Sequence, residues 1–295
     1  MFQRFKVWLV RKYYRFMCRR GWHGHVDETP STELTIPGPA SAIAGRLYPG
    51  ESGSNQPLIV YFHGGGWVIG DLDTHNAFCH VLRQRTGCSV IAVDYRLAPE
   101  HPFPAAVDDC LAATNWVAAH SERLGPSNGQ LIIAGDSAGA NLATCTCLAL
   151  DSSTRARVAG EIVIYPVVDH YNAAPPSYTL RARGQSLTRN FMIWFWDTYL
   201  GNHSPDSATA KCAMPLHADN LASLPPTFLI TAEYDPLRDE GSAYAQRLQQ
   251  AGVPLRYRHF DTAAHGFACS EGPNANFIAF MDDLIDWLQQ LTRSR

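Results

Sequence analysis

Short apolar runs alternate with amphipathic stretches along most of this 295-residue chain. Apolar runs of β type cover residues 46–48, 57–62, 89–93, 131–134, 161–165, 227–231 and 255–260. Stretches with helical periodicity cover residues 74–86, 105–120, 140–150, 189–199, 241–251 and 274–291. Because buried strands that alternate with helices form parallel sheets covered on both faces, we expect an α/β fold with a mostly parallel central sheet.

Two segments stand outside this alternation. Residues from about 170 to 224 are rich in Pro, Asn and Ser and hold one aromatic helical pattern, at 189–199. We interpret this segment as a helical cap inserted between strands of a main domain that covers residues 46–295. Residues 1–45 precede the first recognised strand, and we interpret them as an N-terminal cap segment.

The first 22 residues carry seven basic side chains and no acidic one. Phe2, Phe5, Leu9, Tyr13 and Phe16 fall roughly on one helical face. Basic residues interrupt every apolar run, so the segment lacks the apolar core of a signal peptide. Two interpretations stay open, a lid helix packed on the domain and an interfacial helix on an anionic membrane. The lid is favoured because apolar helical faces usually pack on protein.

Composition narrows the class of protein. A hydrophobic content of 46% and a net charge of -3 are those of an ordinary globular protein, and neither favours nucleic acid as a partner. Eight scattered cysteines form no C-x-x-C pair, so we expect neither a metal site nor a redox motif of that kind. Free thiols in a reducing compartment explain them most simply, and we therefore expect a cytoplasmic protein.

Ser137 stands at the apex of a strand–turn–helix pattern. The apolar run at 131–134 leads into a G-x-S-x-G turn, and a stretch of small residues with helical periodicity follows. Such a turn holds the serine in a strained backbone, and Gly135 and Gly139 remove side chains that would clash there. We predict that Ser137 is a nucleophile; the alternative is an ordinary turn with an incidental serine.

Attack by a serine on an acyl group also needs donors for the oxyanion that develops. Three glycines follow the apolar run at 57–62, and their bare backbone can approach a substrate oxygen. We predict that the N–H groups of Gly65, Gly66 and Ala138 form the oxyanion hole. A dinucleotide-binding loop is the competing interpretation, but the G-x-G-x-x-G spacing is missing.

The general base and the acid that orients it should come from loops after late strands. His265 follows the last predicted strand, whereas His259 lies inside that strand pattern, so we expect His265 to be the base. For the acid, Asp235 and Asp169 each follow a strand. Position favours Asp235 but leaves both open.

Five motifs occur in order, at residues 63–67 (HGGGW), 95–100 (YRLAPE), 135–139 (GDSAG), 235–239 (DPLRD) and 265–267 (HGF). In this order the chain resembles the hormone-sensitive-lipase-like esterases of the α/β-hydrolase fold. The resemblance implies Ser137, Asp235 and His265 as the catalytic triad. It also implies a serine carboxylesterase that hydrolyses short- to medium-chain acyl esters through an acyl-enzyme, with no metal or organic cofactor.

Two positions depart from the family pattern. Ala140 replaces a second glycine after the nucleophile, and we expect its methyl group to tighten packing without affecting the chemistry. The loop after HGGGW reads His75-Asn76 where the family usually has His-Asp. This change puts a supporting charge at that point in doubt.

Substrate selection is less clearly encoded. Four aromatic residues are candidates to line an apolar pocket or to form the core of the lid, namely Trp67, Phe191, Trp194 and Phe195. The resemblance favours the helix that carries Phe191 and Phe195. An amidase or lactonase with the same triad, and a non-catalytic small-molecule receptor on the same fold, are the alternative functions. Both a monomer and a homodimer are compatible with the sequence.

Overall fold

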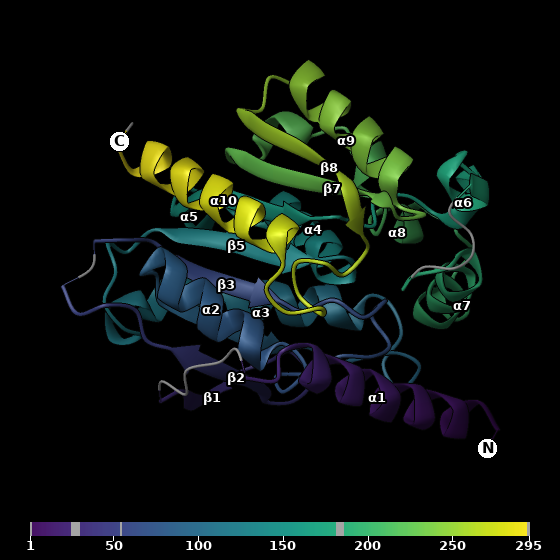
Figure 1. Ribbon diagram of the computed structural model, residues 1–295, viewed down its shortest axis with the longest axis horizontal. Helices are drawn as coiled ribbons and strands as arrows, with labels where there is room; N and C mark the ends of the chain where they lie inside the picture. Colours follow the sequence, from purple (N-terminus) through teal and green to yellow (C-terminus); the bar gives the residue numbers. More distant parts are fainter. Residues whose placement is uncertain (1, 25–29, 54, 181–185, 294–295) are drawn as a thin grey trace.

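The computed structural model describes residues 2–24, 30–53, 55–180 and 186–293. Within these residues eight strands form one sheet in the order β1-β2-β4-β3-β5-β6-β7-β8 (Figure 1). The strands are β1 (Thr32–Ile36), β2 (Ile43–Tyr48), β3 (Leu58–Phe62), β4 (Val90–Asp94), β5 (Leu131–Asp136), β6 (Val158–Ile164), β7 (Thr227–Tyr234) and β8 (Leu255–Ala264). Strand β2 is antiparallel to both of its neighbours, and all other pairs are parallel. The mostly parallel α/β sheet is as predicted.

Helices cover both faces of the sheet. The longer ones are α1 (Phe2–Gly21), α2 (Asn76–Thr86), α3 (Ala105–His120), α4 (Ala138–Ala149), α7 (Arg189–Leu200), α9 (Arg238–Gln250) and α10 (Ala275–Arg293). Shorter helices are α5 (Ser152–Arg155), α6 (Ser177–Leu180) and α8 (Ala208–Lys211). Helices α2 and α10 pack together on one face, while α3, α4 and α9 cover the other (Figure 1).

Two hydrophobic cores result from the alternation of side chains along the strands. In β3, Leu58, Val60 and Phe62 point into the core under α3 and α4. Ile59 and Tyr61 point into the core under α2 and α10. All five residues of β3 are buried, because a central parallel strand is covered on both sides.

The sheet begins earlier than the sequence pattern indicated. Strand β1 and the first residues of β2 lie within the range 1–45 that we assigned to a cap segment, so this range contains part of the sheet as well as α1. The edge strand β1 carries mostly exposed and polar side chains, and it therefore lacks the apolar run that marks the inner strands. Strand β8 continues four residues beyond its predicted end, because β7 pairs with it as far as Ala264.

Helices α1, α6 and α7 lie at the end of the sheet to which the parallel strands point (Figure 1). Helix α7 coincides closely with the aromatic pattern predicted at 189–199. All eight cysteines are free, and Cys212 alone among them is exposed. In the part of the chain that the structure describes, no helix combines the length and hydropathy that a membrane span requires.

Candidate active site

Ser137 occupies the sharp turn between β5 and α4, with φ 55° and ψ -118°. Neighbouring backbone leaves no room for side chains in this turn. A Cβ atom on Gly139 would lie 2.0 Å from the Phe62 carbonyl oxygen, and one on Gly135 would lie 2.3 Å from the Gly139 backbone. Glycine at both positions therefore allows the strained turn that presents Ser137.

His265 and Asp235 continue from Ser137 in a hydrogen-bonded line. His265 Nε2 lies 3.0 Å from Ser137 Oγ, and His265 Nδ1 lies 2.7 Å from Asp235 Oδ2. Asp235 is 1% exposed, and its other oxygen accepts a hydrogen bond from the Leu237 N–H at 2.8 Å. Because a carboxylate only accepts, Nδ1 carries the imidazole proton and Nε2 accepts from the serine hydroxyl.

The alternative acid and base that the sequence offered, Asp169 and His259, lie away from Ser137. Asp169 contacts His217 Nε2 at 2.9 Å, and its neighbours do not include His265. His259 lies on β8, where Nε2 is 3.2 Å from Glu233 and Nδ1 is 3.0 Å from the Thr231 hydroxyl. The structure thus brings Ser137 together with His265 and Asp235.

Gly65 and Gly66 lie in the loop after β3 with φ of 122° and 58°. A Cβ atom on Gly65 would lie 2.2 Å from the Ile69 carbonyl oxygen, and one on Gly66 would lie 2.2 Å from the Phe195 ring. Within the described residues, neither glycine N–H donates to a protein acceptor. The N–H of Ala138 opens α4 and has no intrahelical acceptor. These three N–H groups are available to a substrate oxygen beside Ser137.

Asp136 connects the nucleophile turn to the glycine loop. Its buried carboxylate accepts hydrogen bonds from the Tyr61 hydroxyl and, at 2.8 Å, from the Gly64 N–H. His75 Nε2 lies 3.3 Å away, an electrostatic contact without hydrogen-bond geometry. Burial raises the pKa of Asp136, but His75 and the two donors outweigh it and hold the pKa below its usual value. Asp136 was not among the residues predicted for the site, although its place directly before Ser137 was a usable signal.

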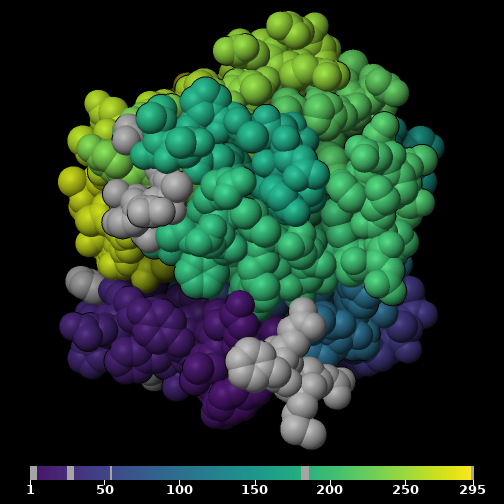
Figure 2. All heavy atoms as spheres, turned by 90° about the vertical axis from the view of Figure 1, so that its right-hand side faces the viewer, coloured from purple at the N-terminus to yellow at the C-terminus, as the bar shows by residue number. Residues whose placement is uncertain are grey.

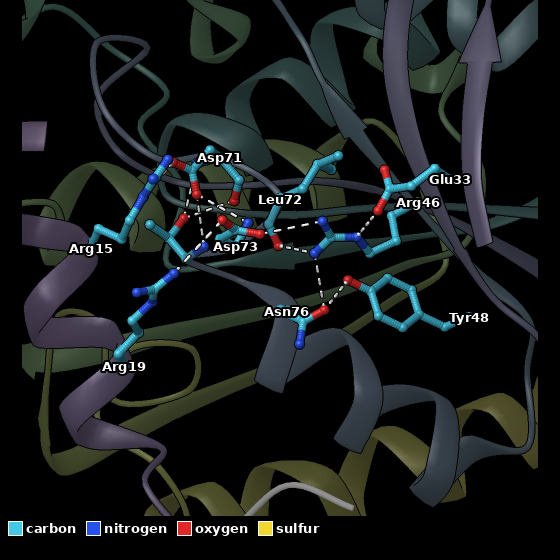
Figure 3. A network of polar contacts seen from close by, with 10 residues as sticks. Arg15, Arg19, Glu33, Arg46, Tyr48, Asp71, Leu72, Asp73 and Asn76 are labelled. Atoms are coloured by element: carbon cyan, nitrogen blue, oxygen red, sulfur yellow. Dashed lines mark hydrogen bonds and ion pairs between the residues drawn. The ribbon is translucent and has the colours of Figure 1, made fainter. Parts of the chain in front are cut away.

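Asn76 stands where the family usually has an aspartate, and it still stabilises this part of the structure through hydrogen bonds. Asn76 Oδ1 accepts hydrogen bonds from Arg46 at 3.1 Å and from the Tyr48 hydroxyl at 3.0 Å (Figure 3). The nearby negative charges belong to Asp71 and Asp73. Ala140 is fully buried, in agreement with a packing role for its methyl group.

A pocket of about 630 Å³ opens above Ser137 and His265. Phe191 and Phe195 of α7 line it, as do Tyr13, Tyr14 and Met17 of α1. Arg20, Glu271 and Asp136 contribute charged groups to the lining. Burial raises the pKa of Glu271, an effect that the nearby His265 partly offsets.

Trp67 does not fulfil the expectation that it lines this pocket. Its indole is fully buried and stacks on the Tyr199 ring, with centroids 4.2 Å apart and an interplanar angle of 5°. Trp67 therefore belongs to the hydrophobic core on which α7 packs. Trp194 is half-buried, with the Lys6 ammonium 5.0 Å above its ring, so it joins α7 to α1.

Helix α1 forms one wall of the pocket. Arg11 donates to both carboxylate oxygens of Glu100, at 3.0 and 2.8 Å, and to the Val68 carbonyl oxygen at 2.8 Å. Arg15 donates through two nitrogens to one oxygen of Asp71 (Figure 3). These contacts attach α1 to the segments that follow the glycine loop.

Comparison with known proteins agrees with this geometry. A family model described as alpha/beta hydrolase fold matches residues 59–269. The carboxylic ester hydrolase LipN of Mycobacterium tuberculosis is 40% identical over 267 residues, which cover 87% of this chain and 69% of that protein. The esterase LipI of the same organism is 36% identical over 284 residues, covering 92% and 86%. A solved esterase of Pyrobaculum calidifontis superposes with a TM-score of 0.89 at 35% identity, covering 97% and 93%.

The doubly covered sheet, the serine turn and the pocket define an α/β-hydrolase. The family match and the identities to several esterases specify the branch within that fold. The chain belongs to the hormone-sensitive-lipase-like esterases and is a carboxylic ester hydrolase.

Proposed function

We propose that this enzyme is a serine carboxylesterase for short- to medium-chain acyl esters, with Ser137, His265 and Asp235 as its triad. The observation that carries the proposal is the continuous line from buried Asp235 through His265 to Ser137, at 2.7 and 3.0 Å. Free N–H groups on Gly65 and Gly66 beside the serine support it.

The proposed reaction begins when Ser137 Oγ attacks the ester carbonyl carbon and His265 Nε2 takes the hydroxyl proton. The N–H groups of Gly65, Gly66 and Ala138 stabilise the oxyanion of the tetrahedral intermediate. Asp235 orients His265 and stabilises its charged form. His265 then gives the proton to the leaving alkoxide, which departs as the alcohol and leaves an acyl-enzyme.

Deacylation repeats these steps with water. His265 takes a proton from the water as its oxygen attacks the acyl carbon, and the collapse of the second intermediate returns a proton to Ser137. The carboxylic acid leaves. All proton transfers use side chains of this chain, so the proposed mechanism includes no metal or organic cofactor.

The dimensions of the pocket support a small ester. Its volume of about 630 Å³ lies within the range of small-molecule sites. Rings from both caps border it, Phe191 from α7 and Tyr13 from α1, and the fixed glycine loop closes another side. Eight free cysteines fit a reducing compartment, so we assign this activity to the cytoplasm.

The decisive experiment is hydrolysis of p-nitrophenyl esters, from acetyl to palmitoyl, by the parent enzyme and by Ser137→Ala. We expect the parent to be fastest on short or medium chains, and the variant to lose about 10⁴-fold or more in kcat. Exposed Ser52 provides the control, because Ser52→Ala should match the parent. A folded Ser137→Ala protein with activity within tenfold of the parent would refute the proposal.

A further inference from the structure

Helix α1 presents large apolar side chains to the solvent. Phe5 is 60% exposed, Trp8 is 52% exposed and Phe16 is 58% exposed. Leu9 and Tyr13 are similarly exposed between them. We call the set Phe5, Trp8, Leu9, Lys12, Tyr13, Phe16 and Arg19 the outer face of α1. Figure 2 shows part of α1, in purple, at the molecular surface next to the green cap segment.

The opposite side of α1 carries the charges that pair with protein. Val7 and Cys18 are buried there, and Arg11 and Arg15 lie between them along the helix. Both arginines form ion pairs, with Glu100 and Asp71 respectively. A surface helix normally turns its apolar side to the protein and its charges to water. In α1 the side chains of Phe5, Trp8 and Phe16 point outwards instead, and no described part of the chain buries them.

The charge of the outer face indicates the chemistry of the partner that would bind there. Residues 2–21 contain no acidic residue, and Lys12 and Arg19 lie among the exposed aromatic side chains. The Arg19 side chain is 66% exposed, and its nearest carboxylate, on Asp73, is 3.9 Å away. Trp and Tyr favour the headgroup region of a bilayer, and Lys and Arg are attracted to anionic lipid. A purely apolar protein partner would leave Lys12 without a counter-charge, and Arg19 with only its long contact to Asp73.

We propose that the outer face of α1 docks on the surface of an anionic lipid bilayer, with the helix axis parallel to the membrane. The exposed rings enter the headgroup region, and Lys12 and Arg19 contact lipid phosphates. Tyr13 and Met17 are exposed and also line the pocket, so the pocket opens beside the docked face. An ester dissolved in the bilayer then reaches Ser137 directly, a consequence that rests on the proposed function.

The test is co-sedimentation of the full-length protein with vesicles of phosphatidylglycerol and phosphatidylcholine, or of phosphatidylcholine alone. We expect binding to the anionic vesicles, weakened by salt. Two variants remove the proposed contacts, Phe5→Ser/Trp8→Ser/Phe16→Ser and Lys12→Gln/Arg19→Gln. Each basic residue near an anionic surface contributes about fivefold in affinity, so the charge variant should bind at least about tenfold more weakly.

Matched controls lie on other helices and loops. Ile278→Ser removes an exposed apolar side chain of α10, and Arg123→Gln removes an exposed charge; both should bind like the parent. Every variant should hydrolyse a soluble acetyl ester within about twofold of the parent, because none of the substituted residues lines the pocket.

Three results would overturn the proposal. The parent fails to bind anionic vesicles, the two variants bind as well as the parent, or the parent forms a dimer that the variants dissociate, which would show that a second copy covers the face. Vesicle binding by Ser137→Ala is measured in parallel and should equal that of the parent. Failure of the docking is thereby distinguished from failure of the proposed esterase function.

Discussion

At the scale of single residues, the space around the glycine loop tightly constrains the site. The Phe195 ring occupies the place of a Cβ atom on Gly66, whose φ is 58°. Any side chain there must displace the ring or shift the backbone of the glycine loop. Both changes alter the lining of the pocket beside Ser137, where Gly66 is a proposed oxyanion donor.

We therefore expect Gly66→Ala to lower kcat by about 10²- to 10³-fold, the usual effect of losing one oxyanion donor. Steady-state hydrolysis of a short p-nitrophenyl ester measures this. Gly252→Ala is the matched control, because Gly252 has φ 77° but nothing within 4 Å of a new Cβ atom. Equal activities of the two variants would mean that the loop adapts and that the Gly66 N–H is not a donor.

Glu161 is a buried carboxyl group that the chemistry does not use. It is fully buried in β6, where one oxygen accepts from the Thr144 hydroxyl and the other has no partner among the described residues. Burial raises its pKa from 4.5 to about 7, and the hydrogen bond from Thr144 offsets only part of this effect. The unfolded chain therefore loses this proton at lower pH than the folded protein does.

This difference makes stability depend on pH with a definite sign. As pH rises from 4.5 to 7, the unfolded state ionises first, so the folded protein loses stability across that window and remains penalised above it. We expect Glu161→Gln to raise the free energy of unfolding by up to about 3 kcal/mol at pH 8 and to leave it unchanged at pH 4.5. Urea unfolding at both pH values tests this, and an equal effect at both would contradict it.

At the scale of elements, a polar network joins α1 to the loop before α2 (Figure 3). Arg15 binds Asp71, whose other oxygen accepts from the N–H groups of Asp73 and Thr74 at 3.0 and 2.8 Å. Arg46 extends from β2 to Asp73 at 3.2 Å. Burial acts to raise the pKa of Asp71, but Arg15 and the N–H donors outweigh this effect and hold the pKa below its usual value. The carboxyl group therefore stays ionised. Helix α1 is thus fixed to the loop region that follows the glycines.

Breaking this link should loosen one wall of the pocket. We expect Arg15→Gln and Asp71→Asn each to raise KM for a soluble ester about two- to fivefold with kcat retained, the scale of a partly exposed ion pair. The double variant should be no worse than either single one, because both remove one interaction. Arg19→Gln, whose pair is 3.9 Å long, should leave KM unchanged. Additive effects would show that the pair is not the link.

At the scale of the whole molecule, opposite ends of β7 carry a core residue that stabilises the fold and a residue of the proposed triad. Phe228 begins β7 in the core beneath α10, with its ring 6.2 Å from that of Phe280 and 5.7 Å from that of Trp287. Asp235 follows the other end of β7, about 23 Å away at the rise of a strand. The Phe228 side chain is therefore distant from the reactive group at Asp235.

We expect Phe228→Ala to lower the free energy of unfolding by about 3–5 kcal/mol while kcat/KM for a short ester at 25 °C stays near that of the parent. Urea unfolding and steady-state kinetics on the same preparations measure both quantities. Ile278→Ala, on the exposed side of α10, should change neither. A parallel fall in kcat/KM for Phe228→Ala would indicate that the cavity is transmitted to the site.

Much of this molecule is encoded locally. Strands such as β3 and β5 are continuous apolar runs, and the turn at Ser137 is set by glycines two residues away on either side. Periodicity and turn chemistry depend on near neighbours, so the sheet class, the serine turn and the glycine loop were predictable. Edge strand β1 was not, because its exposed side chains leave no apolar run.

Other features depend on packing between distant segments. Ser137 and His265 are 128 positions apart, and only the assembled sheet shows that Asp235 rather than Asp169 contacts that histidine. Burial of Trp67 against Tyr199 likewise follows from how α7 packs. The sequence by itself determined that α1 is basic and aromatic. Which side of it faces water was decided by the tertiary structure, because Arg11 and Arg15 have carboxylates to bind on the protein and the aromatic rings have no core to enter.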